Sequence, residues 1–100
     1  LMKAEALFRS GQNGEALNLI NELRENRGAS PLSSLDENAI LDERGRELYW
    51  EGIRRTDQVR FGTFDDTWHD KEVTDSYRVL YPIPQQALDS NPNLMQNPGY

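Results

Sequence analysis

The chain has 100 residues, of which 36% are hydrophobic and 28% charged, and its formal net charge is −6. This composition fits one small globular domain with a lean core, and the acidic balance argues against binding to nucleic acid or anionic lipid, which both require a basic face. With no cysteine and a single histidine, His69, the chain offers neither a thiolate nor a histidine cluster, so we expect no cofactor and no metal site.

Residues 1–28 are predicted to form a helical hairpin. A first helix covers residues 1–10, and the sequence SGQNG interrupts it. A second helix is expected over residues 15–27, because its apolar residues recur at helical spacing and form one face. These residues are Ala16, Leu17, Ile20 and Leu23. Since the chain opens directly into helical sequence, we expect it to be the C-terminal piece of a longer protein.

Residues 35–60 are predicted to form one long helix, which Ser34 and Glu37 would begin as a capping box. Opposite charges recur along it at helical spacing, as in Asp57 with Arg60. Gly45 and Gly52 lie seven residues apart, so they would share a face that another backbone approaches closely. The expected structural ion network consists of Glu43, Arg44, Glu47, Glu51, Arg54, Asp57 and Arg60.

The three glutamates of this segment, Glu43, Glu47 and Glu51, are also candidates for catalytic carboxylates, since glycosidases use paired acids. Residues four apart on one helix point the same way, however, and cannot flank a glycosidic bond from opposite sides of the sugar. The nearby arginines favour structural ion pairs instead, and we expect the chain not to be an enzyme.

Residues 61–100 are predicted to be an irregular strap. Pro82 and Pro84 forbid a helix, and the chain ends in NPNLMQNPGY, whose two Asn-Pro pairs exclude both a helix and a regular strand. The apolar residues of this ending predict that it is ordered and lies over another part of the protein. The acidic residues between 65 and 75 lack the spacing of a calcium loop and are interpreted as a solvated face.

Two tryptophans receive different interpretations. Trp50 lies within the predicted long helix, so core packing is expected. Trp68 lies in the polar stretch DDTWHDKE, where it could stack on a sugar with Asp66, His69 and Lys71 nearby. Packing on the scaffold is the more ordinary interpretation of Trp68, and sugar stacking makes it the candidate ligand-binding residue of this chain. His69 is expected to be a surface residue.

Three stretches, in this order, carry a resemblance: AEALFRSGQNGEALNLINELRENRG, DERGRELYWEGIRRTDQVRFG and YPIPQQALDSNPNLMQNPGY. Together they resemble the C-terminal region of the SusD/RagB family. The resemblance implies a mainly α fold, with residues 1–28 as a tetratricopeptide-like helix pair. Residues 1–100 would then be one fragment of a larger SusD-like domain, since one helix pair cannot bury its own apolar face.

The resemblance also implies a function. Family members are bacterial outer-membrane lipoproteins of the cell surface that bind glycans or other nutrients for uptake and polysaccharide utilisation, and they deliver the ligand to a SusC-like TonB-dependent transporter. This chain would supply scaffold, with the lipid anchor in the missing N-terminal part. The alternative is a helical-repeat module that binds another protein without a small-molecule ligand.

Overall fold

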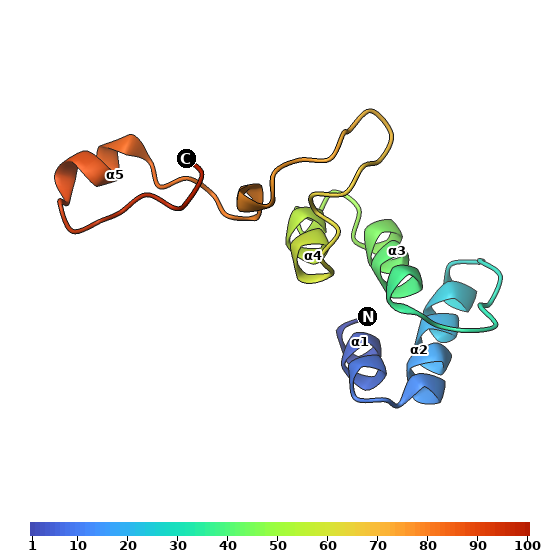
Figure 1. Ribbon diagram of the computed structural model, residues 1–100. Coiled ribbons are helices and arrows are strands. Elements are labelled where there is room, and N and C mark those ends of the chain that lie inside the picture. Colours follow the sequence, from blue (N-terminus) through green and yellow to red (C-terminus); the bar gives the residue numbers. More distant parts are fainter. The chain divides into compact units, whose positions relative to one another are not determined.

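The computed structural model describes residues 1–100 and divides them into two compact units, Leu1–Phe61 and Gly62–Tyr100. The first unit contains α1 (Met2–Arg9), α2 (Asn13–Asn26), α3 (Glu37–Glu47) and α4 (Arg54–Arg60). The second contains a short 3-10 helix (Ser76–Val79) and α5 (Gln85–Ser90) (Figure 1). There is no strand beyond an isolated bridge between Trp68 and Lys71, so the prediction of a mainly α fold is confirmed.

The helices α1 and α2 pack against each other as the expected hairpin, but α2 begins at Asn13, so Gly14 lies inside it and not in the interruption between the helices. Ala4 of α1 and Ala16 of α2 are almost wholly buried. Such short side chains let the two helices approach closely. The close packing of the helices then contributes to stability, although each alanine buries only a small area. Gly11 connects the helices with a φ of 83°, a conformation that glycine adopts without steric cost.

The expected long helix over residues 35–60 is wrong, because the segment forms two helices. The first, α3, ends at Glu47, and α4 begins at Arg54. Between them Trp50 and Gly52 have φ values of 67° and 74°, which no α-helix accommodates. The expectation that both glycines lie on one helical face is therefore also wrong. Gly52 supplies a left-handed turn, and Gly45 faces the side chain of Arg54 rather than another backbone.

The expected capping box at Ser34 is wrong as well. Asp36 caps α3, and its Oδ1 accepts a hydrogen bond of 2.7 Å from the backbone N–H of Ala39. Glu37 does not reach back to the cap but accepts a hydrogen bond from Arg9 of α1 at 3.3 Å. An aspartate two positions further along is as good a cap as serine, and its extended backbone sets the true start of the helix.

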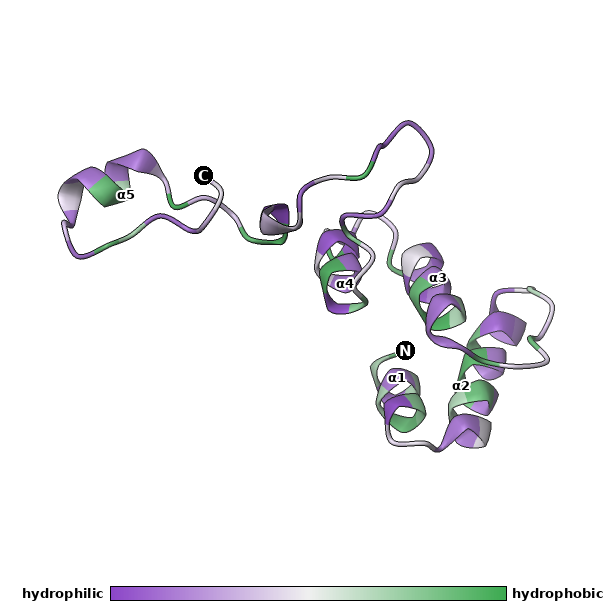
Figure 2. Ribbon diagram, in the orientation of Figure 1, coloured by the Kyte–Doolittle hydropathy of each residue, from purple (hydrophilic) through white to green (hydrophobic).

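The core of the first unit is small. Its buried apolar residues are Ala4, Ala16, Ile20, Ile40 and Leu41. Figure 2 shows that the helices of this unit carry hydrophobic segments beside strongly hydrophilic ones. Trp50, which was expected to pack in the core, is 89% exposed, because the interruption between α3 and α4 takes it out of the helix. Because so few apolar residues are buried, polar contacts form a large part of the interface between the helices.

In the second unit, the chain end folds back on residues 80–83. The side chain of Gln96 bonds to both the N–H and the C=O of Ile83, at 2.8 and 2.9 Å. Asn97 and Tyr100 donate to the carbonyl oxygens of Tyr81 and Leu80. No residue of this unit is buried, and Met95 is 86% exposed within it. That the strap covers a helical scaffold therefore stays a prediction.

Candidate functional site

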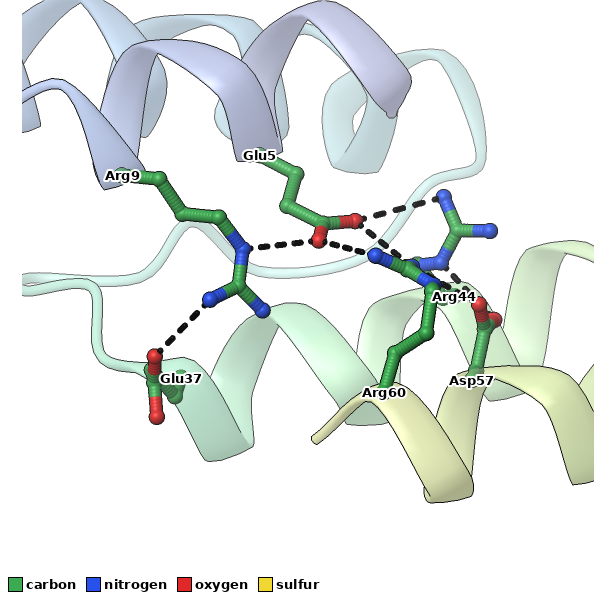
Figure 3. A network of polar contacts seen from close by, with 6 residues as sticks. All are labelled: Glu5, Arg9, Glu37, Arg44, Asp57 and Arg60. Carbon is green, nitrogen blue, oxygen red and sulfur yellow. Dashed lines mark hydrogen bonds and ion pairs between the residues drawn. The ribbon is translucent and has the colours of Figure 1, made fainter. Parts of the chain in front are cut away.

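The dominant polar feature of the first unit is a network of ion pairs centred on Glu5, a buried residue of α1 (Figure 3). Arg60 of α4 binds it with two parallel hydrogen bonds, Nη1 to Oε1 at 2.7 Å and Nη2 to Oε2 at 3.0 Å. Arg9, one turn further along α1, donates to the same Oε1 at 2.9 Å. The two-point contact fixes both the distance and the orientation between α1 and α4.

A second buried pair extends this network to α3. Arg44 donates from Nε to Asp57 Oδ2 at 2.8 Å, and its Nη1 lies 3.8 Å from Glu5 Oε2. Asp57 also accepts from Arg60 Nη2 at 3.0 Å. Arg44 and Asp57 are 7% and 3% exposed, so each charge depends on its partner for the interactions that water would otherwise supply. Three helices therefore meet at a set of charges that compensate one another.

The arginines determine the ionisation of these groups. The hydrogen bond from Arg60 lowers the pKa of Glu5 from 4.5 to about 2, although burial acts in the opposite direction. Burial also acts to raise the pKa of Asp57, but the hydrogen bonds from Arg44 and Arg60 outweigh it and the pKa is lowered. The pKa of Arg60 is raised, chiefly by Glu5 and then by Asp57. These shifts favour the charged forms of Glu5, Asp57 and Arg60 at neutral pH.

A separate set of ion pairs joins α2 to α3. Glu43, a buried residue, accepts from Arg24 of α2 at 2.6 Å and from Arg46 at 2.7 Å. Glu47 receives two hydrogen bonds from Arg27, at 2.6 and 3.0 Å. Burial opposes the ionisation of Glu43, but its arginines lower the pKa, and Arg27 lowers the pKa of Glu47.

The remaining residues of the expected network lie apart from these pairs. Arg54 donates from Nη1 to the backbone oxygen of Leu41 at 2.7 Å, and Glu51 is exposed in the segment between α3 and α4. Sequence reasoning missed the partners on the first two helices, which are Glu5, Arg9, Arg24 and Arg27. The spacing of Glu5 and Arg9, four residues apart, was the one local signal of this set.

These ionisation states bear on the interpretation of the glutamates as catalytic groups. A glycosidase needs one carboxylic acid whose pKa is raised, so that it can protonate the leaving oxygen. Glu43 and Glu47 have lowered pKa values, and both are held by arginines. Their geometry is that of structural ion pairs.

Trp68 lies in a tight turn of the second unit. Its backbone and that of Lys71 exchange two hydrogen bonds, at 3.1 and 2.9 Å. The Lys71 ammonium lies 4.8 Å from the centre of the indole ring, so a cation occupies part of the surface that a sugar would use. Trp68 is 42% exposed, and His69 beside it is highly exposed.

No group of three or more histidine, cysteine, aspartate or glutamate side chains is placed to hold a metal ion. None of the helices combines the length and the apolar character that crossing a membrane demands.

The fold and the site define a mainly helical chain, in which buried arginine–carboxylate pairs join the helices and aromatic rings are exposed at turns. The chain matches the SusD family over residues 1–73 and 63–100, and it belongs to that family, as the resemblance predicted. It is 39% identical over 110 aligned residues to the starch-binding protein SusD of Bacteroides thetaiotaomicron, covering all of this chain and 20% of that protein.

Two relatives from Formosa agariphila are similar over the whole chain as well. The SusD-like proteins P38 and P25 are each 35% identical to it, and the alignments cover 22% and 23% of their lengths. The chain thus spans about a fifth of the length of the curated relatives it matches.

Proposed function

We propose that this chain is a scaffold part of a SusD-like glycan-binding protein of the bacterial cell surface. The observation that carries the proposal is the similarity to the starch-binding protein SusD along the entire chain. Family membership further supports delivery of the ligand to a SusC-like TonB-dependent transporter, and a location at the outer membrane through a lipid anchor outside this sequence.

The contacts of the first unit support a scaffold role. Its buried charges face one another across α1, α3 and α4, and each is held by at least one ion pair. Carboxylates and guanidinium groups that are paired with one another in this way fix the arrangement of the helices. They are not free to act as an acid, a base or a nucleophile in catalysis. Together with family membership, these contacts support a binding protein and not an enzyme.

Within this function Trp68 is a candidate ligand contact. Its partial exposure and its position in a polar turn support stacking on a sugar ring. Lys71 would have to leave the ring, or bind the ligand on the same side, for a sugar to stack there. Replacing Lys71 by methionine removes the competing cation and keeps a side chain of similar length.

The proposal is tested with the natural protein that contains this chain, by affinity electrophoresis in gels containing starch, other glycans or none. Retardation by at least one glycan, together with co-purification of a barrel transporter from membranes, is the expected result. Trp68→Ala should weaken retardation if this turn contributes to the site. A protein that binds no glycan but recovers a partner polypeptide would instead be the helical-repeat interaction module.

A further inference from the structure

The turn between α3 and α4 presents two aromatic rings to solvent. Tyr49 is 75% exposed and Trp50 is 89% exposed, and their ring centres lie 6.2 Å apart at an interplanar angle of 66°. Both lie at a hollow of about 550 Å³ that Leu48, Ile53 and Arg54 also line. Pockets of this size that are apolar with a few polar groups are the usual form of a small-ligand site.

The backbone of Trp50 adds a second, independent observation. Its φ of 67° places a bulky side chain in the left-handed region, which costs of order 1–2 kcal/mol for residues other than glycine. Burial of the indole would offset such a cost, but this indole is exposed. Backbone strain of this kind clusters at active sites and ligand-binding sites, and packing within this chain does not offset it at Trp50.

Arg54 is one of four charged residues that line the hollow, with Arg44, Arg55 and Asp57. Gly45 makes room for the guanidinium of Arg54, because a Cβ at that position would lie 2.8 Å from Nη1. One N–H of Arg54 bonds to a neutral acceptor, the oxygen of Leu41, so the positive charge and the remaining donors stay available. By contrast, Arg44 beside it is committed to Asp57.

We propose that this hollow is a subsite for one sugar ring of a glycan chain, which stacks on Trp50 while an oxygen on its rim accepts from Arg54. The assignment rests on the proposed glycan-binding function and adds to it a place on the first unit, whereas Trp68 belongs to the second. A hydroxyl of a neutral sugar and the carboxylate of a uronic acid offer the same kind of oxygen acceptor. The two sources are distinguished by titrating with maltoheptaose and with an oligogalacturonate.

The experiment follows the indole N–H signals of the ¹⁵N-labelled chain by NMR during each titration. The two tryptophans give two such signals, and Trp50→Gly identifies one of them by its loss. Glycine adopts a positive φ freely, so this variant removes the ring and leaves the turn intact. We expect a saturable shift of the Trp50 signal, and a loss of affinity of tenfold or more in Trp50→Gly and in Arg54→Met. Met95→Ala, which removes an exposed apolar side chain in the other unit, should bind as the parent does.

A shift confined to the Trp68 signal, or equal affinities of the parent and Trp50→Gly, would overturn the subsite while leaving the glycan-binding function standing. Silence of both signals with every glycan, in a chain that melts cooperatively, would also overturn it. The function itself would then be decided by the electrophoresis of the natural protein. A stronger shift with the oligogalacturonate that Arg54→Met abolishes would assign the acceptor as a carboxylate.

Discussion

Glu5 and Arg60 are 55 residues apart in the sequence, and their side chains meet in a two-point ion pair with contacts of 2.7 and 3.0 Å. The pair joins the first helix of the unit to its last. It therefore holds α1 and α4 together, and Arg44 of α3 contacts Glu5 as well. The stability of the first unit should depend on whether Glu5 is charged.

The first prediction concerns this charge. The pKa of Glu5 is 4.5 ordinarily and about 2 in the fold. A lowered pKa stabilises the fold above the ordinary value, and this contribution declines as the pH falls from about 5 and is lost near pH 2. The difference between the two pKa values corresponds to about 3 kcal/mol in the free energy of unfolding.

Glu5→Gln should therefore unfold about 3 kcal/mol more easily than the parent at pH 7. The difference in unfolding free energy between the parent and Glu5→Gln should become steadily smaller below pH 5, as measured by urea unfolding across that range. Glu15→Gln is the matched control, because Glu15 is an exposed glutamate near the start of α2. A difference for Glu5→Gln that stays constant between pH 7 and pH 3 would contradict the assigned role.

The second prediction concerns the buried pair of Arg44 and Asp57. Removing one partner leaves the other charge buried, and such a change costs about 3–5 kcal/mol. Arg44→Met and Asp57→Leu should each be strongly destabilising. The double variant should be less destabilised than the sum of the two, by at least about 1 kcal/mol, because neither charge is then stranded. Chemical denaturation of all four proteins measures this coupling, and strict additivity would argue against a direct pair.

The third prediction separates two candidate caps of α3. Asp36→Ala removes the hydrogen bond to the Ala39 N–H and should cost about 1 kcal/mol of stability. Ser34→Ala, which removes the cap expected from the sequence, should change the unfolding free energy by less than about 0.5 kcal/mol. Thermal unfolding at pH 7 compares the two. Equal losses would mean that the capping box forms.

Periodicity of apolar residues was sufficient to predict helices near residues 1–10 and 15–27, which the structure has as Met2–Arg9 and Asn13–Asn26. It placed the start of the second helix two residues late, because Asn13 and Gly14 belong to its first turn. It failed at the segment 48–53, where opposite charges continue at helical spacing across a break in the helix. Local spacing also identified the contact of Asp57 with Arg60, three residues apart. Asp42 and Arg46 also stand at helical spacing, four residues apart, but Arg46 binds Glu43 instead.

The long-range contacts of the network escaped sequence reasoning for a physical reason. Whether Arg60 binds Glu5 depends on how α4 packs on α1, and no spacing within either helix encodes that arrangement. The same applies to Trp50. Leu48, Tyr49 and Glu51 beside it are compatible with a helix, and only the backbone conformation of the turn shows that the ring faces solvent.

The fourth prediction concerns Gly45, whose place in the interior of α3 costs about 1 kcal/mol relative to alanine. In Gly45→Ala the gain in helix propensity should be offset by displacement of the Arg54 guanidinium and loss of its bond to Leu41, so the net change should be small. In an Arg54→Ala background the same substitution should stabilise the chain by about 1 kcal/mol. Urea unfolding of the four proteins tests this, and stabilisation of equal size in both backgrounds would exclude the contact.

The last prediction tests whether Trp50 belongs to the core. A buried tryptophan replaced by a small residue would cost about 3–5 kcal/mol, through the lost burial and the cavity left behind. Because the indole is exposed and its backbone is left-handed, Trp50→Gly should instead leave the unfolding free energy within about 1 kcal/mol of the parent, with relief of strain opposing the higher entropy of the unfolded chain. Ile20→Ala, at a wholly buried position of α2, provides the scale of a true core loss at about 2–5 kcal/mol. If Trp50→Gly lost as much stability as Ile20→Ala, the indole would be packed in the protein. A sugar could then not stack on it, and the proposed subsite at the turn would be excluded.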